Sequence, residues 1–158
     1  MILRRGAQIA TASLPIHAPD PSEGGGIELV VLYTGPETTA AVLERAVHLT
    51  AGLNATVALV AVCSVPYQSP FGCPLAVRSH LMKRLTELAH GCKLPVRAHL
   101  VLAPSWNDGF HCFLTPRSIV LIGARRRPWR TRDEKLAGEL ADNGHRVALF
   151  RFDSRELK

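Results

Sequence analysis

The hydrophobic positions of this chain fall into five short runs, which are separated by longer segments of mixed character. Four of the runs are almost continuously apolar, which is typical of strands covered on both faces, as in a parallel sheet. The third run alternates in part, because Arg97 and His99 stand between apolar neighbours, and we expect this strand at a sheet edge. The predicted strands are residues 27–33, 57–62, 96–102, 118–123 and 146–152.

The segments between these runs have the periodicity of amphipathic helices, except the third, residues 106–114, which is short and poorly periodic. The first has Pro36 in its first turn and Gly52 after its end, positions that these residues favour. Thr131 and Glu134 have the spacing of a capping box, and Ser105 is suited to cap a short helix. The predicted helices are residues 36–51, 75–90, 106–114 and 132–142. The alternation predicts an α/β fold with three layers and a five-stranded parallel sheet.

Residues 1–26 differ from the rest of the chain. They contain several prolines and a run of three glycines at residues 24–26, and they show no periodic pattern. Such a stretch offers little apolar surface to offset the entropy lost on ordering. We therefore predict a flexible N-terminal tail over residues 1–26 and a single domain over residues 27–158.

Composition limits the classes of protein to which the chain can belong. Of its 158 residues, 47% are hydrophobic, which is enough for a packed core. No apolar run approaches the roughly 20 residues that span a bilayer, and the N-terminus does not have the pattern of a secretory signal. We expect no membrane segment and a cytoplasmic location.

Cysteine and histidine usage gives no catalytic or metal site. Cys63, Cys73, Cys92 and Cys112 form no CxxC pair, and we expect reduced thiols, with Cys63 in the core. The seven histidines are scattered. The nucleophile elbow, the Walker A loop and the HExxH pair are all missing from the sequence. We therefore predict no catalytic residue and no metal ligand, and an enzymatic activity, although possible on such a fold, has no support in the sequence.

Three stretches of apolar pattern resemble the universal stress protein family. They are residues 27–34 with the following helix and residues 56–63, the strand at 118–123 that ends in Gly123, and the segment 145–151. The resemblance spans about residues 27–152. It implies the adenine nucleotide α-hydrolase-like fold, with strand order 3-2-1-4-5. It also implies a homodimer in which the fifth strands, Arg146–Phe152, pair with each other.

The resemblance also bears on nucleotide binding. Many members of that family bind ATP through a G-x2-G-x9-G-S/T pattern after the fourth strand. Gly123 can be the first glycine of the pattern, but Arg126 stands at the second, and Leu136 and Ala137 stand where Gly-Ser is expected. ATP-binding members also tend to carry an aspartate at the end of the first strand, where this chain reads Tyr33-Thr34-Gly35. We therefore expect no resident cofactor, with ATP or another nucleotide as the candidate if one binds.

The candidate ligand site lies between the first and fourth strands. Ligands of open α/β sheets bind beyond the carboxyl ends of the strands, where the strand order reverses. Guanidinium groups suit phosphate or carboxylate, and Trp129 within the arginine-rich loop can stack on a base. The candidate ligand-binding residues are Thr34, Gly35, Val62, Gly123, Arg125, Arg126 and Arg127.

Two functional hypotheses remain open. The first is a non-catalytic, universal-stress-like regulatory or stress-response protein that acts as a homodimer. The alternative is a sensor of a nucleotide or another anionic small molecule at the candidate site. The net charge of +6 is compatible with either hypothesis, and also with a basic loop that only keeps the surface solvated. We do not expect nucleic acid as a partner, because no RNP-like or helix-turn-helix pattern accompanies the arginines.

Overall fold

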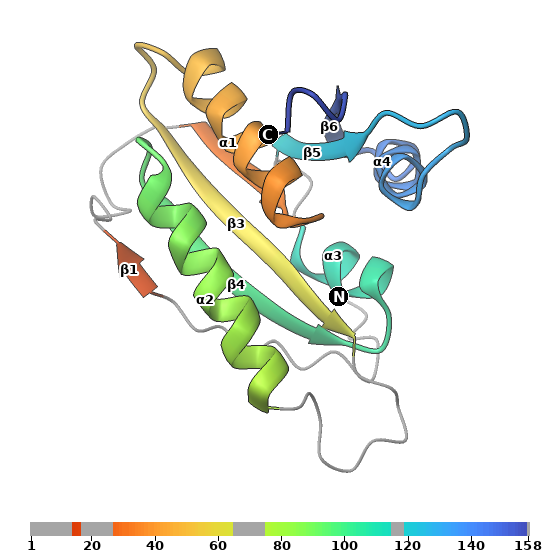
Figure 1. Ribbon diagram of the computed structural model, residues 1–158, viewed down its shortest axis with the longest axis horizontal. Coiled ribbons are helices and arrows are strands. Elements are labelled where there is room, and N and C mark those ends of the chain that lie inside the picture. Colours follow the sequence, from red (N-terminus) through yellow and green to blue (C-terminus); the bar gives the residue numbers. More distant parts are fainter. Residues whose placement is uncertain (1–13, 17–26, 65–74, 115–118, 158) are drawn as a thin grey trace.

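The computed structural model describes residues 14–16, 27–64, 75–114 and 119–157 (Figure 1). The strands in this part are β1 (Leu14–Ile16), β2 (Ile27–Leu32), β3 (Ala55–Ser64), β4 (Val96–Ala103), β5 (Ile119–Arg125) and β6 (Arg146–Phe152). The helices are α1 (Pro36–Leu49), α2 (Leu75–Gly91), α3 (Trp106–Phe113) and α4 (Arg132–Asp142).

These strands form one sheet with the order β1-β4-β3-β2-β5-β6. The strands from β2 to β6 are parallel to their neighbours, and the central strand β2 pairs with both β3 and β5. Counted in chain order, these five strands have the order 3-2-1-4-5. The predicted fold class is therefore confirmed.

Strand β1 was not predicted from the sequence. It pairs antiparallel with β4, with Leu14 opposite Ala98 and Ile16 opposite Val96. Pro15 is compatible with such a strand because proline is tolerated where a sheet ends. The expectation that β4 is an edge strand was wrong, since β1 covers its outer side. The rest of the predicted tail lies outside the described residues.

The sheet separates two apolar layers. Leu29 and Val31 of β2 belong to the core on the side of α1 and α2, whereas Val30 and Leu32 belong to the core on the side of α3 and α4. All four side chains are 5% exposed or less. Because alternate residues of a strand point to opposite faces, a continuous apolar run is what a strand covered on both faces requires.

The ends of the helices follow the predicted local chemistry. The Ser105 hydroxyl accepts a hydrogen bond of 3.1 Å from the backbone N–H of Asp108 and caps α3. Thr131 and Glu134 form both bonds of a capping box at the start of α4, at 3.3 and 3.0 Å. These caps fix the starts of two helices that cover the same face of the sheet.

Candidate functional site

The structure brings the two ends of the predicted crevice into direct contact. Thr34 follows β2 and Gly123 lies in β5, 89 positions later in the chain. The Thr34 hydroxyl donates a 2.8 Å hydrogen bond to the backbone carbonyl of Gly123. The expected proximity of these two residues is therefore confirmed, and the contact is a direct bond between them.

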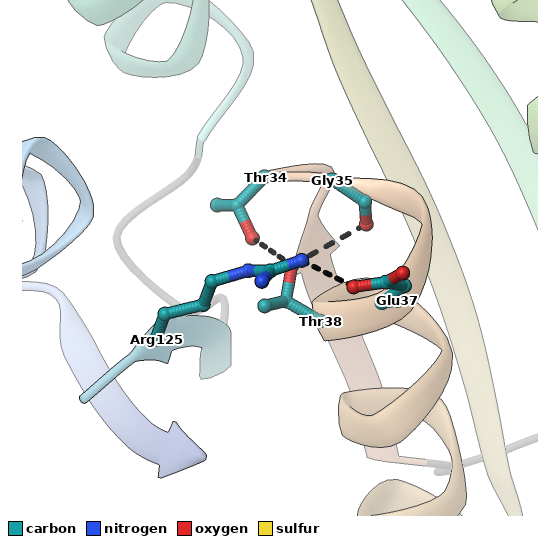
Figure 2. Close-up of polar contacts among 5 residues, drawn as sticks. All are labelled: Thr34, Gly35, Glu37, Thr38 and Arg125. Carbon is teal, nitrogen blue, oxygen red and sulfur yellow. Dashed lines mark hydrogen bonds and ion pairs between the residues drawn. The ribbon is translucent and has the colours of Figure 1, made fainter. Parts of the chain in front are cut away.

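Threonines of α1 extend this contact into a small polar network (Figure 2). The hydroxyl oxygens of Thr34 and Thr38 lie 3.0 Å apart, and the Thr39 hydroxyl accepts a bond of 3.3 Å from the backbone N–H of Thr34. The Thr38 hydroxyl is also 3.4 Å from the Gly35 carbonyl oxygen. Thr38 and Thr39 are 5% and 0% exposed, so their hydroxyl groups form hydrogen bonds within the protein rather than with solvent.

Gly123 packs closely against helix α1. A Cβ atom added at this position would lie 2.7 Å from Val42 Cγ2 and 3.0 Å from the backbone oxygen of Thr38. Real Cβ atoms essentially never approach another heavy atom as closely as 2.7 Å. The space beside this glycine is therefore filled by α1, and the absence of a side chain permits close packing of helix on sheet.

Arg125 lies across the start of α1, and Figure 2 shows its guanidinium directed to the Glu37 carboxylate. The two groups form an ion pair, and both side chains are about half exposed, at 46% and 51%. Glu37 lies in the first turn of α1, where a negative charge is favoured by the helix dipole. A carboxylate from the chain itself thus occupies the predicted anion-binding position on Arg125.

Both the backbone and the side chain of Arg126 contact residues at the end of β6. Its N–H donates a 2.8 Å hydrogen bond to the carbonyl of Phe152. Its Nη1 atom lies 3.5 Å from Oδ2 of Asp153. The backbone amide that a second glycine would offer to a phosphate is therefore used inside the protein.

The other arginines of the loop contact aromatic rings. Arg127 lies 5.9 Å from the centroid of the Trp129 ring, and Arg132 lies 3.9 Å from that of Trp106. Both separations are within the range of cation–π attraction. Trp129 is 64% exposed. This part of the loop presents cationic and aromatic surface to solvent.

Val62 does not join the other predicted site residues. It packs against the core on the side of α3, where a Cβ on Gly109 would lie 2.5 Å from its Cγ1 atom. Gly123 contacts α1 on the opposite face of the sheet. The predicted set is therefore divided between the two faces.

The sequence interpretation missed the residues of α1 that close the crevice. Thr38, Glu37 and Val42 lie within the first two turns of that helix. An available signal was the position of Thr38 in the first turn of the predicted helix, four residues after Thr34 and therefore near it in the chain. The pairing of Glu37 with Arg125 had no local signal, because these residues lie 88 positions apart.

The residues whose pKa values are shifted do not form one cluster. Burial raises the pKa of Tyr33, Cys92 and Asp133 and lowers the pKa of His99. Among the described residues, no hydrogen bond or ion pair joins any two of these four groups. They therefore form no acid–base pair.

Two further features concern metals and thiols. In the part of the chain that the structure describes, no group of three or more His, Cys, Asp or Glu side chains is arranged to hold a metal ion. Cys63 is 6% exposed, as predicted for a core residue, but it is disulfide-bonded. The expectation of a reduced thiol at this position was wrong.

Within the described ranges, none of the helices is long and apolar enough to cross a membrane.

Comparison with known proteins supports the fold. No protein-family model matches the chain, and no curated protein matches its sequence. Among solved structures, the chain is similar to a protein from the universal stress protein family of Burkholderia pseudomallei. That alignment has a TM-score of 0.55 and 16% identity, and it covers 79% of this chain and 94% of the other. At this identity the likeness establishes a universal-stress-like fold and does not extend to activity.

Proposed function

We propose that this protein is a non-catalytic regulatory protein of the universal stress type, which acts in a stress response as a homodimer. The observation that carries the proposal is the closed crevice, in which Thr34 is bonded to Gly123 and α1 fills the space beside the glycine. A nucleotide at this place would have to displace a helix and break a partly buried hydrogen-bond network. The packing of α1 against Gly123 argues against a nucleotide at this place and favours a role in partner contact.

The dimer surface that we propose is the free edge of β6. Among the residues that the structure describes, β5 is the one strand that pairs with β6. Its residues Val147, Leu149 and Phe150 are only partly buried and pack against the two cores. A long apolar edge strand is a template for pairing with another chain.

The register of β6 shows which backbone groups are available. The Phe152 carbonyl accepts a bond from Arg126, which follows β5, so Phe152 directs its polar backbone groups toward β5. Because successive residues of a strand alternate in direction, Leu149 directs its N–H and C=O to the free edge. Pairing of β6 with its copy would use these groups.

The test is the mass of the particle in solution, measured by size-exclusion chromatography with light scattering. We expect a dimer for the natural chain and for Leu149→Ala, which loses side-chain packing but keeps the backbone N–H. Leu149→Pro removes that N–H, and we expect a folded monomer by circular dichroism. A monomeric natural chain at high concentration, or a dimeric Leu149→Pro, would overturn the proposed dimer.

A second candidate function is the sensing of an anionic small molecule by the arginine-rich loop. The observation that favours it is the exposure of Trp129 next to Arg127, whose guanidinium has no carboxylate partner among the described residues. An aromatic ring beside a free guanidinium suits a ligand that carries both a base and a phosphate.

Calorimetric titration with ATP, AMP and a cyclic dinucleotide tests this candidate. We expect binding that is weakened in Arg127→Gln and unchanged in Lys83→Gln, which removes the same charge from α2. Flat titrations at millimolar ligand exclude the sensor. Equal loss in both variants would indicate attraction to net charge rather than a site.

The cytoplasmic location inferred from the sequence also needs a test, because stable disulfides are rare in that compartment. Alkylation in intact cells, followed by peptide mass spectrometry, reports the state of Cys63. Labelling of Cys63 without prior reduction would support a reducing compartment. Labelling only after reduction would contradict the cytoplasmic location.

A further inference from the structure

A recess between α1 and α2 continues along α1 to Glu156 and Leu157, and at Glu37 it adjoins the crevice described above. It consists of two adjoining hollows of about 420 and 350 Å³, which share Ala40 and Glu44 of α1. Small-molecule sites in proteins typically occupy about 300–1,000 Å³. The larger hollow alone therefore has the size of a site for a small organic molecule.

The floor of the recess is apolar. In the larger hollow, Ala40, Leu43 and Val47 of α1 face Leu88 of α2. Leu43 is 3% exposed, whereas Ala40, Val47 and Leu88 are only partly covered. A ligand that covered these partly exposed side chains would gain from the removal of apolar surface from water.

The rim of the recess is acidic, although the chain carries a net charge of +6. Four carboxylates line the two hollows: Glu37, Glu44, Glu87 and Glu156. Three of them are engaged, Glu37 with Arg125, Glu87 with Arg84 at 3.4 Å, and Glu156 with the backbone N–H of Asp153 at 2.7 Å. Glu44, which belongs to both hollows, makes no hydrogen bond or ion pair with any described residue.

The two basic residues of the lining have a separate explanation. His48 lies in the last turn of α1, and Lys93 follows the end of α2. Cationic groups at these positions complement the negative ends of the helix dipoles. Glu44 lies one turn before His48, and no cation in the described part of the chain pairs with it.

We infer that the recess between α1 and α2 binds a small amphipathic amine, with its ammonium group at Glu44 and its apolar body on Ala40, Val47 and Leu88. The charge complementarity selects a cation over an anion of the same length. The apolar floor selects an alkyl or aryl amine over a small hydrated cation. The contacts of this site, Glu44 and the apolar floor, include neither Thr34 and Gly123 of the crevice nor the β6 edge.

The probes that test this inference are n-octylamine, octanoate of matched chain length, and ethylamine as a cation with almost no apolar body. Amide shifts in heteronuclear NMR titrations of the full chain locate the site and give affinities. We expect octylamine to shift amides of α1 and α2 and to bind at least threefold more tightly than octanoate or ethylamine. Equal binding of octanoate, or shifts that do not localise to α1 and α2, would overturn the inference.

Two variants and a matched control distinguish the contribution of the Glu44 charge to octylamine binding from that of the apolar floor. Glu44→Gln should weaken octylamine binding about three- to fivefold, the range of an exposed ion pair, and abolish the preference over octanoate. Ala40→Phe should fill both hollows and abolish octylamine binding while the circular dichroism spectrum is retained. Asp142→Asn removes a carboxylate from α4 on the opposite face and should leave binding unchanged. An unchanged preference in Glu44→Gln would contradict the role assigned to this carboxylate, and Glu44→Asp should keep the preference.

Discussion

The crevice between β2 and β5 and the recess between α1 and α2 are both built on helix α1, but only the first is closed. In the crevice, Thr38 and Val42 of the helix lie against Gly123, and Glu37 takes the guanidinium of Arg125. In the recess, Ala40 and Glu44 of the same helix line a hollow. The place where α/β sheets usually bind ligands is here part of the packing, and the open space lies elsewhere on α1.

The strongest test of the closed crevice is Gly123→Ala. The added Cβ would meet Val42 Cγ2 at 2.7 Å and the backbone oxygen of Thr38 at 3.0 Å, so α1 must shift. We expect a loss in the free energy of unfolding of about 3 kcal/mol, the upper end for overpacking. Gly91→Ala is the matched control, because nothing lies within 4 Å of a Cβ at that position. Denaturant unfolding of the two variants gives the comparison, and equal stabilities would mean that the crevice is open.

A smaller effect is expected when the bond across the crevice is removed. Thr34→Val keeps the shape of the side chain but leaves the Gly123 carbonyl without its 2.8 Å donor. The expected loss in the free energy of unfolding is about 1–2 kcal/mol. Thr34→Ser retains the hydroxyl and should lose less than half of this amount. If Thr34→Val were as stable as the natural chain, the bond would contribute nothing to closure.

The ion pair over the crevice should contribute less to the free energy of unfolding than the buried contacts beneath it. Glu37→Gln removes the carboxylate partner of Arg125, but both side chains are about half exposed. Pairs at such exposure contribute at most about 1 kcal/mol, and less at high salt. Unfolding measured at low and high ionic strength should show a small difference that salt removes. A large, salt-independent loss would place the pair among the buried contacts.

The smallest expected effect is on the alkylation rate of Cys92, which lies in the recess. This free thiol lines the larger hollow and is partly buried. Burial raises its pKa, so the thiolate is scarcer at pH 8 than in an exposed cysteine, and alkylation should be several-fold slower. The rate should rise as the pH climbs through the raised pKa. Peptide mass spectrometry of iodoacetamide-treated protein measures it, and an alkylation rate equal to that of a model thiol would show that the recess does not shield Cys92.

The layout of strands and helices follows from local information in the sequence. The predicted helix at residues 132–142 coincides with α4, because Thr131 and Glu134 supply its capping box and Asn143 and Gly144 follow its end. The strand at 146–152 likewise coincides with β6. Periodicity and caps act over a few residues, so a single sequence is enough to locate them.

The sequence pattern by itself determined the α/β order and the parallel sheet, because continuous apolar runs suit strands covered on both faces. The approach of Thr34 to Gly123 was expected from the strand order that the family resemblance implied. The pairing of β1 with β4, the ion pair of Arg125 with Glu37 and the recess shared by Ala40 and Glu44 were decided only by the tertiary structure. These contacts join positions far apart in the chain, or depend on how closely two helices pack on one face of the sheet. No local pattern of residues encodes such a distance.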